Sequence, residues 1–424
     1  MESTALFDFI AQCPTAYHTA HTVCEALTAA GYTRLAESDA WTLEAGRGYF
    51  VTRGTSSMLA FCAPTDFSGF VIAAAHGDSP APKIKENADL HGADYTKLSV
   101  EPYGGMIFST WFDRPLSVAG RVVVRTARGI AVRLCDLRVP VAVIPNVAIH
   151  MNRTMNDGVK LNAAVDMLPL YGGADAEPLR ARVAASLGVA ADDILSADLF
   201  MYNPQAGVEW NGFISAPRLD DLQCVYAALH GFLDAAGGTA AKVLAVFDNE
   251  EVGSQTRQGA ASTFLYDVLR RVSAAYGRDY DAAVAGSLML SCDNAHAVHP
   301  NHPEYADANH TVRMNGGVVV KYNANQRYTT DAWSAALFRV ICARAGVPVQ
   351  LYANRADMPG GSTLGNIANT QVSLPTVDIG AAQLAMHAAY ETAGAADTAY
   401  LYRAIKQAYE TTLTALEDGV AEIQ

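Results

Sequence analysis

Three short apolar segments of the chain each end on side chains that could bind a metal ion. The first segment is followed by His76 and the third by Asp293, and the second is followed by Glu250 and Glu251. If the segments are parallel strands of one sheet, these side chains meet at the edge where open α/β sheets bind ligands. Histidine and carboxylate groups are ligands of Zn²⁺, Mn²⁺ and Co²⁺. The sequence therefore predicts a divalent metal site at this edge.

The number of acidic side chains favours two ions over one. Crowded carboxylates repel one another and take up protons unless cations neutralise them. Two ions about 3.5–4 Å apart can polarise a carbonyl group and generate hydroxide at neutral pH. Because neighbouring side chains point in different directions, one of Glu250 and Glu251 can bind an ion while the other acts as general base. Alternatively, FDNEEVGS is the start of a helix whose acidic residues complement the helix dipole.

Other polar residues near these positions suit supporting roles. Asp78 follows His76 by two residues and could orient its imidazole ring, because a ligating histidine usually bonds a carboxylate or carbonyl through its second nitrogen. The alternative is a buried histidine satisfied by a nearby aspartate. In the histidine-rich segment 295–302, Pro300 and the following Pro303 break the helix that would align the histidines. We expect a loop there, with hydrogen-bonding histidines beside the site.

The elements that must position these residues can be read from the apolar pattern. Residues 70–75, 242–247 and 286–292 are short, continuously apolar runs, and helical segments such as 221–236 separate them. Such runs are typical of strands covered on both faces. We therefore expect an α/β fold with a mixed, mostly parallel sheet flanked by helices. Residues 16–30 and 397–417 are predicted as further helices, the first stopping at Gly31 and the second capped by Asp397.

The middle of the chain differs from its two ends. Residues 119–126 and 129–136 are strand-like around a short turn, and residues 139–149 follow without an intervening helix. A chain of 424 residues also exceeds the usual size of one hydrophobic core. We expect a β-rich domain inserted into a discontinuous α/β domain, with the insertion at residues 90–207 and the α/β domain at residues 1–89 and 208–424.

Composition excludes several functional classes. The formal net charge of −13 repels phosphate backbones, so nucleic-acid binding is disfavoured. No segment approaches the roughly 20 apolar residues of a membrane-spanning helix, and the first residues do not resemble a targeting peptide. The seven cysteines are scattered and form no C-x-x-C motif, which indicates free thiols in a reducing compartment. We expect a cytoplasmic protein that binds neither nucleic acid nor membranes.

Beyond these local patterns, the chain resembles the aspartyl aminopeptidases, which are dinuclear-metal exopeptidases that form tetrahedral dodecamers. The resemblance runs along the whole chain, in order, through the segments AAAHGDSPAPKIK (73–85), WFDRPLSVAGRV (111–122), IPNVAIHMNR (144–153), SAPRLDDLQ (215–223), FDNEEVGSQTRQGA (247–260), SCDNAHAVHPNH (291–302), VKYNANQRYTTD (320–331), DMPGGSTLG (357–365) and DIGAAQLAMHAAYE (378–391). It implies a dinuclear zinc exopeptidase fold in which the inserted domain mediates dimerisation.

The resemblance also implies a complete set of metal ligands. In the family pattern Asp220 bridges two ions. His76 and Asp293 then share one ion with it, and Glu251 and His387 bind the other. Without the resemblance, Asp220 would be taken for the N-cap of the helix that follows it. His387 would be taken for a surface histidine in an alanine-rich segment.

The remaining implied roles concern catalysis and substrate. Glu250 matches the general base and Asp78 the acid that orients the first histidine. His150 matches a histidine that reaches the active site of a neighbouring subunit, where it could stabilise an oxyanion; a structural histidine at a strand edge is the alternative. Lys321 matches a lysine that would pair with an acidic substrate side chain; the alternative is an exposed strand lysine. The segment around Gly361 matches part of the substrate-binding wall.

Three residues depart from the family pattern, which commonly has Thr, Asn and Cys where this chain has Gly77, Asp221 and Gly360. Gly77 removes a branched side chain beside a ligand, so we expect a looser loop. Asp221 adds an acid next to Asp220, and related dinuclear peptidases have a cis peptide bond at this point, which we also predict here. Gly360 belongs to the predicted substrate-binding wall and would shift specificity.

The implied function is release of N-terminal residues, above all Asp and Glu, from small peptides. It needs two divalent ions per subunit, Zn²⁺ first, with Mn²⁺ or Co²⁺ as alternatives, and dimers that assemble into a dodecamer. One alternative is a metal-dependent amidase or deacylase that acts on a non-peptide substrate through the same ligands. Another is a non-catalytic shell or cargo protein that has kept self-assembly.

Overall fold

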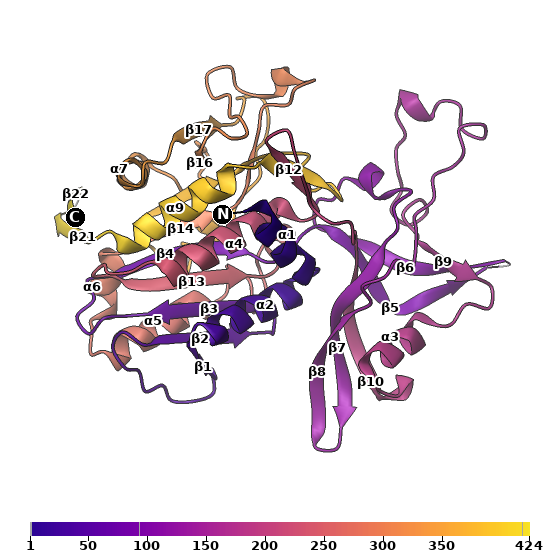
Figure 1. The fold of residues 1–424 in the computed structure, drawn as a ribbon, viewed down its shortest axis with the longest axis horizontal. Helices are drawn as coiled ribbons and strands as arrows, with labels where there is room; N and C mark the ends of the chain where they lie inside the picture. Colours follow the sequence, from indigo (N-terminus) through magenta and orange to yellow (C-terminus); the bar gives the residue numbers. More distant parts are fainter. Residues whose placement is uncertain (1, 93, 418) are drawn as a thin grey trace.

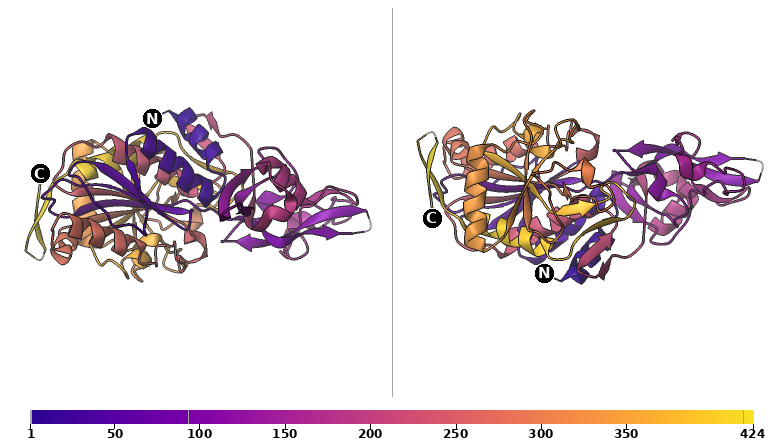
Figure 2. Two further views of the ribbon diagram at one scale, coloured as in Figure 1. Left: turned by 90° about the horizontal axis from the view of Figure 1, so that it is seen from below. Right: turned by 90° about the horizontal axis from the view of Figure 1, so that it is seen from above.

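The computed structural model describes residues 2–92, 94–417 and 419–424. Most of the chain forms a nine-stranded sheet covered by helices, and a separate six-stranded sheet projects from one side of it (Figures 1 and 2). Among the described residues, no helix is both long enough and apolar enough to cross a membrane.

The nine-stranded sheet contains parallel and antiparallel pairs, and the parallel pairs predominate. This confirms the prediction of a mixed, mostly parallel sheet in an α/β fold. Its strands, in spatial order, are β1 (Thr33–Leu35), β2 (Gly48–Arg53), β3 (Ser57–Cys62), β13 (Ala241–Phe247), β4 (Phe70–His76), β14 (Leu288–Cys292), β18 (Thr376–Gly380), β16 (Val318–Tyr322) and β17 (Val349–Ala353).

Helices cover both faces of this sheet. Within β4, Val71, Ala73 and Ala75 pack against one helix layer, and Ile72 and Ala74 pack against the other. Because both faces are buried, the strand reads as a continuous apolar run. The first layer contains α1 (Ser3–Gln12), α2 (Ala16–Ala29), α4 (Leu219–Asp234), α7 (Ala332–Ala345) and α9 (Asp397–Glu410), and the second contains α5 (Phe264–Ala275), α6 (Tyr280–Ala285) and α8 (Leu364–Ala368).

The six-stranded sheet is antiparallel and has its own apolar core. Its first strand begins before the predicted domain boundary at residue 90, and its last strand ends before residue 207; the division into two domains stays a prediction. In spatial order it contains β8 (Gly129–Asp136), β7 (Ser117–Thr126), β10 (Ile194–Tyr202), β5 (Ala81–His91), β6 (Tyr95–Tyr103) and β9 (Leu170–Gly173), and α3 (Leu179–Leu187) packs on it.

Smaller elements complete the fold. A five-stranded sheet contains β11 (Val208–Trp210), β12 (Phe213–Ala216), β20 (Glu391–Gly394), β19 (Ala382–Leu384) and β15 (Ala295–His296), and a C-terminal hairpin contains β21 (Leu413–Glu417) and β22 (Val420–Ile423). The short 3₁₀ turns are η1 (Phe108–Trp111), η2 (Met155–Asp157), η3 (Ala191–Asp193), η4 (Glu250–Val252) and η5 (Pro303–Tyr305).

Two sequence predictions about the C-terminal helix are wrong. The C-terminal helix ends at Glu410 rather than at residue 417, because the threonine-rich segment that follows favours extended structure and pairs as a hairpin. Asp397 does not cap this helix but lies inside it, and its carboxylate accepts main-chain N–H bonds from Asn315 and Gly317. Residues 139–149 form only isolated bridges, since their two prolines lack the N–H donors of a strand.

Candidate active site

The candidate site lies at the carboxyl ends of three neighbouring strands, β13, β4 and β14. His76 is the last residue of β4, and Asp293 directly follows β14. Glu250 and Glu251 lie in the η4 turn just after β13. The structure therefore brings together the side chains that the apolar runs predicted to share one edge of the sheet.

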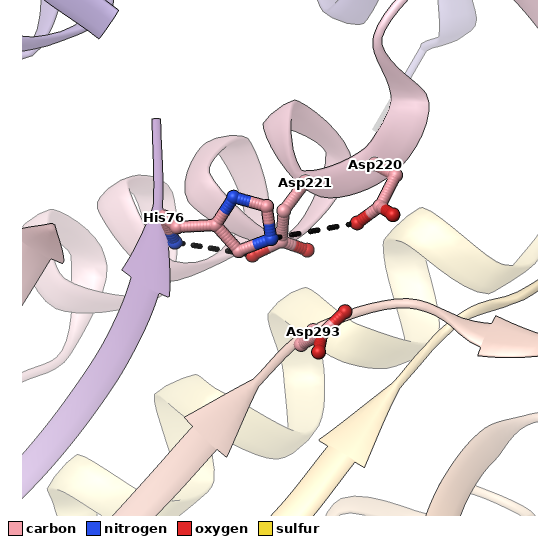
Figure 3. Close-up of side chains that lie close together, drawn as sticks. All are labelled: His76, Asp220, Asp221 and Asp293. Atoms are coloured by element: carbon pink, nitrogen blue, oxygen red, sulfur yellow. Dashed lines mark hydrogen bonds and ion pairs between the residues drawn. The ribbon is translucent and has the colours of Figure 1, made fainter. Parts of the chain in front are cut away.

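Asp220 enters the site from the start of α4, where Arg218 has a left-handed backbone conformation. The peptide bond between Asp220 and Asp221 is cis, as predicted. The Oδ1 atom of Asp220 lies 3.6 Å from Nε2 of His76, and a dashed line marks this contact in Figure 3. Its Oδ2 atom lies 3.5 Å from Nε2 of His387. Asp220 thus faces a different histidine with each oxygen.

Potential ligand atoms gather on both sides of Asp220. Within each set, one ligand atom from every residue lies within 4.8 Å of the others: the first set is His76, Asp220, Asp221 and Asp293, the second is Asp220, Glu251 and His387, and a third is His76, Glu250 and Glu251. The first two sets share Asp220. They also contain every residue that the family resemblance implies as a ligand, with Asp221 in addition.

Hydrogen bonds to main-chain carbonyls fix how both histidines face the site. Nδ1 of His76 lies 3.1 Å from the carbonyl oxygen of Asp78, and Nδ1 of His387 lies 3.1 Å from that of Gly105. A carbonyl can only accept, so each Nδ1 carries a proton, and loss of the second proton would leave each ring with its Nε2 lone pair facing the site. This is how second-layer groups orient metal-ligating histidines.

The buried carboxylates, like the two histidines, are arranged as ligands of a metal ion would be. In the described part of the chain, Asp220 Oδ1, Asp221 Oδ1 and Glu251 Oε1 are buried without a hydrogen-bond partner. Buried anionic oxygens are costly unless a cation or a donor satisfies them. Burial, aided by the other carboxylates, raises the pKa of Glu250 to about 8 and lifts the pKa of Glu251 well above its usual value. Bound cations would keep these groups ionised.

Asp78 holds several parts of the site at once. Its carboxylate lies 3.5 Å from Nδ1 of His76, in addition to the carbonyl contact. The same carboxylate accepts main-chain N–H bonds from Glu250 and Glu251, both at 3.2 Å. It also accepts a hydrogen bond from the Tyr103 hydroxyl at 2.6 Å.

Glu391 holds the main chain on the His387 side of the site, as Asp78 does on the side of His76. It was not identified from the sequence. Its carboxylate accepts the main-chain N–H of Asp220 at 3.0 Å and that of His387 at 2.7 Å. The backbone of His387 has a positive φ of 69°, so this bond stabilises an uncommon conformation. The one available signal was that Glu391 ends the last of the recognised sequence segments.

A cavity of about 170 Å³ opens on the site. It is lined by the candidate ligands together with His296, Lys321, Tyr328, Tyr352 and Gly361, among others. His296 belongs to the histidine-rich segment, whose histidines were predicted from the sequence to lie beside the site. Nevertheless, the sets of potential metal ligands found in the described residues contain no histidine of that segment.

Lys321 is a buried residue, which excludes the exposed strand lysine considered from the sequence. The residue is 2% exposed, and its ammonium donates hydrogen bonds to the carbonyl oxygens of Asp293 at 2.8 Å and Asn294 at 3.3 Å. It also lies 3.4 Å from Oδ2 of Asp293. A fixed positive charge therefore stands at the wall of the cavity.

The loop after His76 is tightly packed, so the expectation of a looser loop at Gly77 is wrong. The N–H of Gly77 donates to the carbonyl of Phe247 at 2.8 Å, and its own carbonyl accepts from the Thr19 hydroxyl at 3.1 Å. A Cβ atom at Gly77 would lie 3.0 Å from Cγ2 of Thr19. The glycine lets Thr19 approach closely and does not leave space.

Two other predicted residues do not line the cavity in the described structure. Gly360 lies outside the lining, and a Cβ atom there would lie 2.4 Å from Oδ1 of Asn354. His150 is exposed in a turn between β8 and β9 and does not reach the site of its own chain. Its predicted role would therefore have to be in a neighbouring subunit.

The fold and the donor set together define a metal-dependent hydrolase. The chain belongs to the M18 peptidase family, described as aminopeptidase I zinc metalloproteases, whose family model matches residues 9–409. It is therefore a metal-dependent aminopeptidase, and this family membership favours peptidase activity over the deacylase and shell alternatives.

Individual relatives agree over nearly the whole chain. The chain is 41% identical to a probable M18 family aminopeptidase 2 of Clostridium acetobutylicum, with 95% of this chain and 97% of that protein covered. It resembles Ape4, solved in complex with Nbr1, at a TM-score of 0.93 and 30% identity, with coverage of 96% and 85%. It also resembles the mApe1 dodecamer of S. cerevisiae, at a TM-score of 0.84 and 27% identity, with 95% of each chain covered.

Proposed function

We propose that this aminopeptidase releases N-terminal Asp and Glu residues from small peptides with the help of two divalent ions. The observation that carries the proposal is the orientation of Asp220, whose two oxygens face His76 and His387 separately. A carboxylate in this position can bridge two ions. Zn²⁺ is the first candidate, because the family is one of zinc metalloproteases, and Mn²⁺ or Co²⁺ would suit the same donors.

Five side chains would hold the ions. His76 and Asp293 would share one ion with Asp220, and Glu251 and His387 would share the other. When bound, the ions would polarise the scissile carbonyl and lower the pKa of a water between them.

Glu250 is our candidate for the general base. Its main-chain N–H is fixed by Asp78, and its side chain lines the cavity without being needed as a ligand of either ion. The carboxylate would take a proton from the attacking water and pass it to the leaving amine. For this the group must be ionised at the start, and the nearby cations would offset the effect of burial that raises its pKa.

Lys321 is our candidate for the preference for acidic residues. Its ammonium is held by two carbonyls in the wall that also contains Gly361, so it adds little ordering cost when a substrate binds. A carboxylate on the first residue of a peptide would meet this charge. A neutral side chain would gain no such contact.

We further propose that the inserted domain mediates dimerisation, and that dimers assemble into a tetrahedral dodecamer in which His150 serves a neighbouring subunit. The likeness to a dodecameric aminopeptidase and the exposure of His150 support this. His150 would then help to stabilise the oxyanion formed during hydrolysis. An active monomer in light scattering coupled to an activity assay would contradict this arrangement.

The experiment that tests the function compares peptides that differ only in their first residue, Asp, Glu, Leu or Lys. Each is assayed with a chelator and after addition of Zn²⁺, Mn²⁺ or Co²⁺. An N-acetylated Asp peptide is the matched control, because an aminopeptidase needs a free α-amino group. We expect chelator-sensitive cleavage of the Asp and Glu peptides only. Cleavage of the acetylated peptide would instead support an amidase or deacylase.

A further inference from the structure

The inserted six-stranded sheet reaches the candidate metal centre through the segment that follows β6. Tyr103, the last residue of β6, donates a hydrogen bond from its hydroxyl to Oδ2 of Asp78 at 2.6 Å. The carbonyl of Gly105 accepts from Nδ1 of His387, and the N–H of Ile107 donates to the carbonyl of His387 at 3.0 Å. One short segment thus contacts both halves of the centre.

The position of the Tyr103 ring is set by the inserted sheet. The ring packs edge-on against Phe200 of β10, which lies on the far side of β5 in the same sheet, with the centroids 5.3 Å apart. The hydroxyl accepts a hydrogen bond from Nδ2 of Asn249 at 2.9 Å. Because Asn249 donates to the hydroxyl oxygen, the single hydroxyl proton of Tyr103 is free to be donated to Asp78.

Asp78, held by Tyr103, in turn fixes the positions of the candidate base and of two candidate ligands. Its two carboxylate oxygens accept the main-chain N–H groups of Glu250 and Glu251, and its carbonyl oxygen fixes the ring of His76. A rotation of the Asp78 carboxylate would therefore release the backbone of a candidate ligand and of the candidate base together. The partly buried hydrogen bond from the Tyr103 hydroxyl to this carboxylate opposes that rotation.

We propose that Tyr103 is a positioning residue for the metal centre, which holds Asp78 and so couples the inserted sheet to His76, Glu250 and Glu251. This inference rests on the proposed function, because its consequences are measured on metal binding and turnover.

The test compares Tyr103→Phe with Tyr202→Phe. Tyr202 is the control: it lies in the same sheet, and its hydroxyl donates at 2.7 Å to Asp136, whose carboxylate otherwise contacts Arg138 in the described part of the chain. Zn²⁺ affinity is measured by competition with a fluorescent chelator. We expect Tyr103→Phe to bind Zn²⁺ about 10–100-fold more weakly, the range typical of second-layer changes, and Tyr202→Phe to match the wild type.

Kinetics separate positioning from a purely structural role. Tyr103→Phe should lower kcat, with a change of less than about twofold in KM, and its effect should not add to that of Asp78→Asn, because both act through one carboxylate. Additive effects, or unchanged Zn²⁺ affinity in Tyr103→Phe, would overturn the inference. If Tyr103→Phe does not fold, Phe200→Leu loosens the same ring, and unchanged affinity in that variant would overturn the inference equally. A wild-type protein that binds no metal would contradict the proposed function instead.

Discussion

Asp220 points one carboxylate oxygen at Nε2 of His76, at a distance of 3.6 Å, and keeps its second oxygen for a different partner. A carboxylate that served only to cap α4 would turn toward the free N–H groups of the helix. The main-chain N–H of Asp220 is itself taken by Glu391, so its backbone is held while its side chain faces the cavity. This arrangement suits a ligand that bridges two ions.

Removing the shared ligand should affect both ions, whereas removing a terminal ligand should affect one. We expect Asp220→Asn to retain fewer than one ion per chain and His387→Ala to retain about one, measured by elemental analysis after dialysis. The exposed histidine variant His302→Ala is the control and should keep the wild-type content. Equal losses in Asp220→Asn and His387→Ala would contradict the bridging role.

Glu250→Gln should keep the metals and lose turnover. Glutamine has the shape of glutamate but cannot take up the proton, and general-base catalysis contributes about 10²–10⁴-fold. We therefore expect kcat to fall by at least this range while the metal content stays unchanged. Glu209→Gln, an exposed change on β11, is the matched control. Near-normal turnover in Glu250→Gln would remove it as the base.

Lys321→Met should change which peptides are cleaved. Loss of the fixed ammonium removes the partner of an acidic side chain, so the ratio of kcat/KM for Asp over Leu peptides should fall about tenfold, equivalent to roughly 1.4 kcal/mol. Circular dichroism and metal content check that the buried change has not disrupted Asp293. An unchanged ratio in a folded, metal-loaded variant would place the specificity elsewhere in the cavity.

Metal removal should destabilise the protein more at high pH than at low pH. In the metal-free protein, burial raises the pKa of Glu250 to about 8. Burial lowers the pKa of His387, but the carboxylates of Asp220 and Glu251 outweigh this effect and raise the pKa of His387 to about 10. Groups with a raised folded-state pKa favour folding at low pH, and this contribution is lost as the pH rises through the folded pKa. We expect the Tm of the metal-free protein to fall between pH 6 and pH 9. The Tm of the metal-loaded protein should fall less over this interval, because metal binding strengthens as protons leave the ligands. A Tm of the metal-free protein that rises over this interval would contradict the assignment.

If His150 acts in a neighbouring subunit, two inactive variants should complement each other. His150→Ala supplies an intact Glu250, and Glu250→Gln supplies an intact His150. Subunits mixed after dissociation should regain a fraction of wild-type activity, while each variant alone, treated in the same way, should not. Mixed assemblies that stay as inactive as their parents would contradict action between subunits.

The site could be predicted from the sequence where its residues come directly after a recognisable strand. Continuous apolar runs made β4, β13 and β14 recognisable, and the residues that end them had to share an edge, because parallel strands place their carboxyl ends together. His76, Glu250, Glu251 and Asp293 were therefore accessible from pattern alone.

Other residues of the site have no such local signal. Asp220 and His387 were found only through the family resemblance, since a helix start and a turn with positive φ can serve many purposes. Tyr103 and Glu391 were missed because their partners are distant in sequence: 25 residues separate Tyr103 from Asp78, and 171 separate Glu391 from Asp220. Such pairs form only when separate elements pack together.

The central claim is that one carboxylate serves two ions, and titration of the metal-free protein tests it most directly. Zn²⁺ is added in steps, and cleavage of an Asp-terminated peptide is measured together with the bound metal per chain. We expect full activity only as the second equivalent binds, with two ions per chain at saturation. Full activity at one bound ion per chain, with no further change up to saturation, would contradict the two-ion account.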